Sequence, residues 1–140
     1  MTMGTAASWR PLPRITLDSA EFWKSTHEHT MKLQKCSACG EFRYYPSEAC
    51  HACGSLMYEW RAVGGKGEIH TFTVLHRAKG NPFENETPIA IILVTLDEGP
   101  TMMSNLIDYE EHELAIGARV TLDYEDVNEE ITLPVFRPER

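Results

Sequence analysis

The chain has 140 residues, a hydrophobic content of 42% and a formal net charge of −8 at pH 7. This length fits one compact unit or two small modules, and no apolar run approaches the roughly eighteen residues that a membrane-spanning helix needs. Residues 1–63 carry seven Lys/Arg and six Asp/Glu, whereas residues 64–140 carry six and fifteen, so their formal charges are +1 and −9. A nucleic-acid groove needs clustered positive charge, and the acidic second half therefore argues against binding of DNA or RNA.

The N-terminal part predicts an arm followed by a helix. Residues 1–17 contain prolines and small residues, and their start, Met1 to Ser8, lacks the basic region and following apolar stretch of a secretory signal. Asp18 and Glu21 resemble a capping box, and apolar residues at helical spacing follow them. The pattern predicts a helix over Ser19–Gln34, and we assign residues 1–34 to the arm and helix.

All four cysteines occur in two tight pairs, Cys36/Cys39 and Cys50/Cys53, each followed directly by glycine. Two such turns facing each other can place four thiolates at the corners of a tetrahedron, as a structural zinc site requires. The alternatives are two disulfides, four inert thiols, or iron in a rubredoxin-like site, since tetrahedral sulfur suits both metals. We favour a zinc ribbon over residues 35–56.

A closed four-thiolate site has no open coordination position, so its metal stabilises the fold and cannot activate water or a substrate. A segment of about twenty-five residues is too small to build its own core, and the metal replaces one. Because four cysteines complete the sphere, we expect His27, His29 and His51 on the surface. Free or metal-bound thiols favour a reducing cytoplasm as the compartment.

Three residues between the cysteine pairs, Arg43, Tyr44 and Tyr45, have two interpretations. Two tyrosines on a hairpin tip are costly to expose without a purpose. They either cover the small core of the ribbon or contact a partner or ligand.

After the ribbon, the hydrophobic pattern changes to period two with short turns. Six strands are predicted, over 57–63, 68–76, 89–96, 101–107, 120–126 and 131–136, with one or two helical turns in the acidic stretch 108–116. The run Ile89–Leu96 is apolar at nearly every position, which is typical of a strand buried on both faces. From residue 68 on, three strands, a short helix and two strands follow the order of a five-stranded OB barrel, and we assign residues 57–140 to this domain. Periodicity alone also allows another small β-barrel.

Several motifs in this order resemble the DUF35 family, whose members are described as zinc-ribbon, OB-fold acyl-CoA-associated proteins. The resemblance runs from about residue 19 to residue 138, and apart from the cysteines each motif is weak singly. The motifs are Phe22-Trp23, Leu33–Gly40, Tyr45-Pro46, Cys50–Gly54, Gly67–Val74, Leu96–Pro100 and Thr132–Phe136. The resemblance implies a mainly β protein with an N-terminal helix, a rubredoxin-like zinc ribbon and a C-terminal OB barrel.

The resemblance also implies a role beside an acyl-CoA enzyme. Family members act as companion subunits of thiolase-superfamily proteins, lipid-transfer-protein-like aldolases or enoyl-CoA hydratases in aromatic, steroid or fatty-acid degradation. It therefore implies a hetero-oligomer in which this chain is not the catalyst, and only the four cysteines carry over as functional residues.

The residues agree that the chain is a poor enzyme by itself. It has no G-x-S-x-G elbow, P-loop or dinucleotide fingerprint, and a metal would occupy every cysteine that could act as a nucleophile. His76, at a strand end, and Arg77, Lys79 and Phe83 after it form the one cluster that resembles a site. Loops at a barrel rim often bind ligands and partners, although a histidine there is more often structural.

Arg77 or Lys79 could meet a phosphate of coenzyme A, and Phe83 could reach into a partner's substrate tunnel. Two other functions compete with the companion-subunit hypothesis. The first is a stand-alone acyl-CoA-binding module, and the second is a single-stranded nucleic-acid-binding OB protein, which the acidic barrel disfavours.

Overall fold

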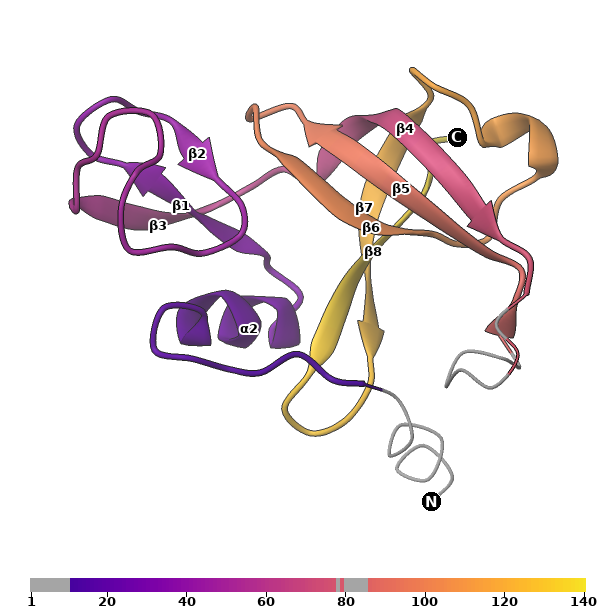
Figure 1. The fold of residues 1–140 in the computed structure, drawn as a ribbon, viewed down its shortest axis with the longest axis horizontal. Coiled ribbons are helices and arrows are strands. Elements are labelled where there is room, and N and C mark those ends of the chain that lie inside the picture. Colours follow the sequence, from indigo (N-terminus) through magenta and orange to yellow (C-terminus); the bar gives the residue numbers. More distant parts are fainter. Residues whose placement is uncertain (1–10, 78, 80–85) are drawn as a thin grey trace.

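The computed structural model describes residues 11–77, 79 and 86–140. Figure 1 shows a small sheet beside a barrel, with helix α2 lying next to both. In the small sheet the strand order is β2-β1-β3 and both pairings are antiparallel. The bounds here are α2 Ala20–His27, β1 Lys32–Cys36, β2 Phe42–Arg43 and β3 Tyr58–Ala62.

Five strands close the barrel in the order β4-β5-β6-β8-β7. Their bounds are β4 Lys66–Leu75, β5 Ile89–Leu96, β6 Thr101–Leu106, β7 Arg119–Asp126 and β8 Thr132–Pro138. The predicted five-stranded OB barrel is therefore confirmed, and the predicted short helix is a single 3₁₀ turn, η2 Glu111–Glu113. Within the described residues, no helix has the length and apolar character needed to cross a membrane.

The predicted helix over Ser19–Gln34 was wrong in its second half. The helix α2 stops at His27, and His29 has a left-handed φ of 59°, so the chain leaves the helix there. The segment from Lys32 is a strand because it pairs along its whole length with β3. The predicted capping box was also wrong, since the N-cap is Ser19 and its hydroxyl accepts a hydrogen bond from the Thr16 amide.

The strand predicted over 57–63 exists, but it belongs to the ribbon and not to the barrel. Its residues Tyr58–Ala62 pair with β1 from Cys36↔Tyr58 to Lys32↔Ala62. The ribbon sheet therefore includes residues on both sides of the segment 35–56.

One hydrophobic cluster joins helix, ribbon and barrel. Phe22 of α2 and Leu33 of β1 are fully buried, and they belong to the same cluster as Ile92 and Phe136 of the barrel. The three parts therefore share a core, which places the ribbon in a fixed position against the barrel.

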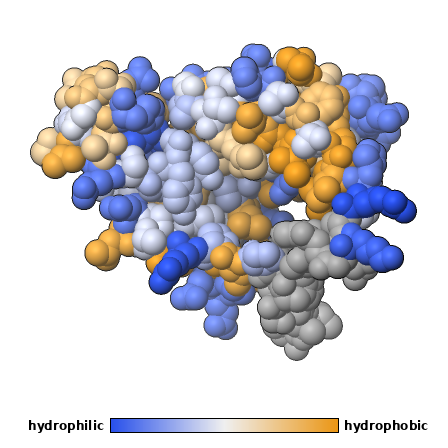
Figure 2. All heavy atoms as spheres, in the orientation of Figure 1, coloured by the Kyte–Doolittle hydropathy of each residue, from blue (hydrophilic) through white to orange (hydrophobic). Residues whose placement is uncertain are grey.

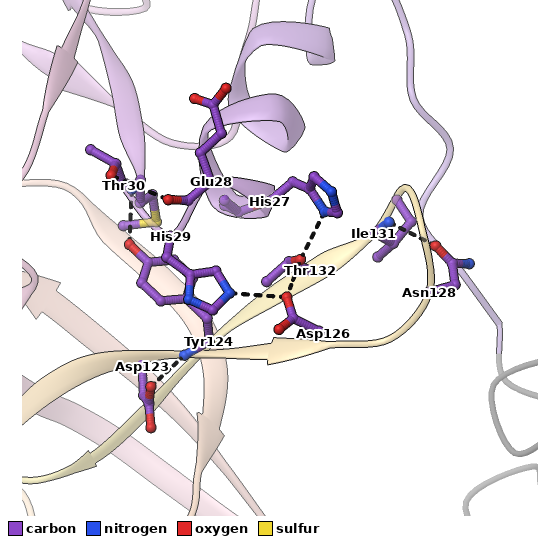
Figure 3. A network of polar contacts seen from close by, with 12 residues as sticks. His27, Glu28, His29, Thr30, Asp123, Tyr124, Asp126, Asn128, Ile131 and Thr132 are labelled. Atoms are coloured by element: carbon purple, nitrogen blue, oxygen red, sulfur yellow. Dashed lines mark hydrogen bonds and ion pairs between the residues drawn. The ribbon is translucent and has the colours of Figure 1, made fainter. Parts of the chain in front are cut away.

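A polar network reinforces this junction at the end of α2 (Figure 3). His29 Nε2 lies 3.0 Å from Asp126 Oδ1, and Thr132 donates its hydroxyl proton to the same oxygen at 2.7 Å. These two bonds hold the pKa of Asp126 below its ordinary value. Because the hydroxyl proton of Thr132 is used, His27 Nδ1 must donate to Thr132 Oγ1, at 3.2 Å.

Tyr124 completes the network. The ring of His29 stacks on the Tyr124 ring with centroids 4.7 Å apart, and the Tyr124 hydroxyl accepts the amide of buried Met31 at 2.8 Å. A residue of the barrel thus caps the backbone where α2 passes into the ribbon.

We predict that Tyr124→Phe lowers the free energy of unfolding by about 1–2 kcal/mol, because the buried Met31 amide loses its acceptor. Urea denaturation followed by circular dichroism measures this change. The control is Tyr109→Phe, since the described residues give the Tyr109 hydroxyl no hydrogen bond. Equal stabilities of the two variants would show that the Met31 bond does not matter.

Candidate metal centre

The structure brings all four cysteines together at one end of the ribbon. Their Sγ atoms lie within 4.8 Å of one another, with Cys36 and Cys53 separated by 3.6 Å and Cys39 and Cys50 by 3.7 Å. A tetrahedral ion with Zn–S bonds of about 2.3 Å requires S···S separations of about 3.8 Å. A disulfide would need about 2.05 Å. The donor set therefore fits a structural zinc ion, and the disulfide alternative is excluded.

The two turns repeat the same backbone geometry. Gly40 donates its amide to the Cys36 carbonyl at 2.9 Å, and Gly54 donates to the Cys50 carbonyl at 2.7 Å. These glycines have φ of 82° and 80°, a conformation that side chains other than glycine rarely adopt. Each pair of cysteines is therefore held in a knuckle by the residue that follows it.

Backbone amides prepare the two buried cysteines as ligands. The amide of Cys39, 3.5 Å from the sulfur, lowers the pKa of Cys36 to about 6, and the amide of Cys53 lowers the pKa of Cys50. The Glu41 amide also lowers the pKa of Cys39, but burial and the neighbouring thiols outweigh it and raise that pKa to about 12. Thiolates bind metal, so a proton must leave Cys39 when the ion binds.

Arg43 lies inside the ribbon, with 2% of its surface exposed. Its Nε donates to Gln34 Oε1 at 3.1 Å, and its Nη2 donates to the Ser47 carbonyl at 3.0 Å. Its guanidinium also lies 4.9 Å from the centre of the Tyr58 ring. This burial takes Arg43 out of reach of an external ligand and makes it part of the ribbon core.

The two tyrosines lie where the ribbon meets the helix. Tyr44 packs edge-on against Phe22, and burial raises the pKa of Tyr44 to about 12. Tyr45 is 42% exposed and accepts a hydrogen bond from Trp23 Nε1 at 2.9 Å. Tyr44 also lines a groove of about 570 Å³ that is otherwise formed by barrel and arm residues. Of the three residues between the cysteine pairs that the sequence offered as contacts, Tyr44 is therefore the one that lines a concave surface.

The rim cluster is only partly described. His76, Arg77 and Lys79 follow β4 and are exposed, and the structure gives them no hydrogen bond or ion pair with other described residues. Phe83 lies outside the described residues. Their roles at a ligand or partner remain predictions.

Sequence reasoning missed the residues that join the modules. Thr132 lies in a family motif that gave no sign of this contact, Asp126 lies in none, and His29 is 97 residues from Asp126 in the chain. His27, His29 and His51 are exposed, as expected of histidines that do not bind the metal.

We predict that Cys36→Ser abolishes metal binding and unfolds the ribbon, because the ion loses a ligand and the segment has no sufficient core without it. The wild-type chain should bind about one zinc per molecule. Elemental analysis measures the stoichiometry and distinguishes zinc from iron. Ser37→Ala, at the adjacent position, is the control. Full metal content in Cys36→Ser would contradict a four-cysteine site.

Zinc affinity should depend on pH in two ranges. At pH 7–8 the raised pKa values of Cys39 and Cys53 keep these thiols protonated, so binding must displace at least their two protons. Below about pH 6 Cys36 is protonated as well, and the dependence becomes steeper. Competition with a chelator of known proton affinity gives the slope of log affinity against pH. A slope near four at pH 7–8 would mean that all four thiols are protonated before binding, and that the backbone amides do not lower the pKa values of Cys36 and Cys50 enough to matter.

Comparison with known proteins gives the same two modules. The model of the ChsH2 rubredoxin-like zinc ribbon domain matches residues 23–58, and that of the ChsH2 C-terminal OB-fold domain matches residues 60–125. The chain is 33% identical over 129 residues to a "Probable enoyl-CoA hydratase alpha subunit" of Thermomonospora curvata. That match covers 92% of this chain but only 40% of the relative, so the chain spans less than half of its length.

Two further matches extend over most of the proteins compared. The solved structure titled "Ltp2-ChsH2(DUF35) aldolase" superposes with a TM-score of 0.80 at 32% identity, covering 91% of this chain and 98% of that one. A DUF35 domain-containing scaffold protein of Methanocaldococcus jannaschii is 30% identical over 98 residues, which are 69% of this chain and 68% of that protein. Because the zinc-ribbon and OB-fold models together match most of the chain and this relative is covered over two thirds of its length, the chain belongs to the DUF35 family.

Proposed function

We propose that this chain is a non-catalytic scaffold subunit of an acyl-CoA-processing complex, whose catalytic partner is an aldolase, hydratase or thiolase-superfamily protein. The observation that carries the proposal is the match to a chain of the Ltp2–ChsH2 aldolase structure over 98% of that chain. The relatives called scaffold proteins and hydratase alpha subunits support the same class. We place the subunit in the cytoplasm, where thiol ligands stay reduced.

The metal centre supports a structural role. When bound, a zinc ion would supply folding energy to the ribbon and no open position for a substrate. Cys36, Cys39, Cys50 and Cys53 would hold the ion, so no thiol is left for acyl transfer. The chain's own contribution is then to hold the ribbon, helix and barrel in one arrangement for a partner.

Direct contact with the acyl-CoA substrate is a narrower part of the proposal. Residues 64–140 carry a formal charge of −9, which repels the phosphates of coenzyme A from most of the barrel. Arg77 and Lys79 are exposed cations at the end of β4 and are the candidates for a phosphate contact. Any such contact would be limited to this rim and completed by the partner.

The test is capture from the organism in which the chain occurs. A tagged full-length chain should retain an aldolase, hydratase or thiolase subunit in near-equal amount, identified by mass spectrometry. The Cys36→Ser variant is the control, because its ribbon should be unfolded. Capture of no acyl-CoA enzyme, or thioester turnover by the isolated chain, would overturn the proposal. Tight binding of an acyl-CoA to the isolated chain in calorimetry would favour the stand-alone module instead.

A further inference from the structure

The outer face of strand β5 is unusually apolar for a barrel. Its alternate residues Ala90, Ile92, Val94 and Leu96 are buried in the core. The residues between them, Ile89, Ile91 and Leu93, point outward and stay partly exposed. A strand that faces water on one side normally carries polar residues there. The sequence of β5 is that of a strand covered on both faces, and the described residues cover the outer face only in part.

The apolar face continues onto the neighbouring strands. Met103 of β6 pairs with Leu93, and Leu75 of β4 pairs with Ile89, and paired residues of antiparallel strands point to the same side. Met103 is 64% exposed. Figure 2 shows hydrophobic atoms gathered over β5 on the face in view. We call Leu75, Ile89, Ile91, Leu93 and Met103 the outer stripe.

All residues of the outer stripe except Leu93 line the groove of about 570 Å³. Tyr44 of the ribbon, Leu133 of β8 and Pro11 of the arm also line the groove. Residues of both the ribbon and the barrel therefore line the groove, so its shape depends on where the zinc ribbon lies. It is large enough for side chains of another protein to enter.

The surroundings of the groove are acidic. The groove itself is lined by Glu86 and Glu125, which it shares, with Ile89 and Asn105, with a second cleft of about 480 Å³. That cleft is also lined by Asp108 and Asp123, which both pair with the single guanidinium of Arg137. If a second copy of this chain docked here, residues 64–140 of the two copies, each with a formal charge of −9, would repel each other. This negative charge equally disfavours an anionic lipid or acyl-CoA as the occupant.

We propose that the outer stripe and its groove are the docking surface for the catalytic aldolase or hydratase subunit, and that this partner presents apolar side chains bordered by Lys and Arg. The inference rests on the proposed function and adds where the partner binds and by what chemistry. Apolar contacts at the centre supply affinity, and the opposite charges at the border speed association and select the partner.

The experiment uses the full-length chain and the partner subunit purified after capture. Met103→Glu and Ile91→Glu should weaken the dissociation constant by about 30-fold or more, the effect expected of a central apolar contact. The matched controls are Ile116→Glu and Leu56→Glu, which alter residues that are 70% and 62% exposed and do not line the groove. They should stay within about threefold, since isolated surface changes have small effects. The association rate for the wild type should fall as salt is raised.

The outcomes separate the two proposals. If the wild-type chain binds no acyl-CoA enzyme, the proposed function fails. If it binds one and the stripe variants bind as tightly as the controls, only the docking surface is wrong. If the wild-type chain alone forms dimers in sedimentation and Met103→Glu is monomeric, the stripe is a contact between copies and the inference is overturned. Circular dichroism and zinc content show that each variant is folded.

Discussion

The ribbon depends on four sulfur atoms gathered around one position. Its sheet is too small to hold itself, because β2 has only two residues and pairs with β1 at only two positions. A metal bound by four thiolates contributes on the order of 10–16 kcal/mol in small zinc peptides, far more than a few strand pairs provide. When bound, the ion would stabilise the ribbon that encloses Arg43 and places Tyr44 against Phe22 of α2, so a non-catalytic metal site would shape the groove that Tyr44 lines.

The connection between the ribbon and the barrel has both an apolar and a polar part. Phe22 and Leu33 share one cluster with Ile92 and Phe136, and so loss of the ribbon would expose the barrel core as well. At the edge of this cluster His29 bonds Asp126 and stacks on Tyr124. His29 follows α2 directly, and His27 at the end of the helix bonds Thr132, so the end of α2 connects the ribbon to β7 and β8.

The sequence carried enough information for the metal centre and the barrel because both depend on short-range patterns. Paired cysteines with glycines specify a knuckle locally, and alternation of apolar residues specifies a strand. The end of the helix was not predictable in this way. Lys32–Cys36 continues a helical pattern and becomes a strand only because Tyr58–Ala62 returns beside it. The burial of Arg43 likewise depends on contacts with Gln34, Ser47 and Tyr58. No local sequence pattern predicts that these three groups enclose a cation.

The remaining disagreement between pattern and structure concerns β5, and its cause differs from that of the helix. The helix boundary was a wrong prediction, whereas the apolar outer row of β5 is present and the described part of the chain covers it only partly. An apolar surface of this kind promotes non-specific association unless something opposes it. The net charge of −8 provides that opposition, because copies of the chain repel one another at long range. A partner with basic residues around an apolar centre meets no such repulsion, so the acidity of the barrel and the apolar stripe together select one kind of surface.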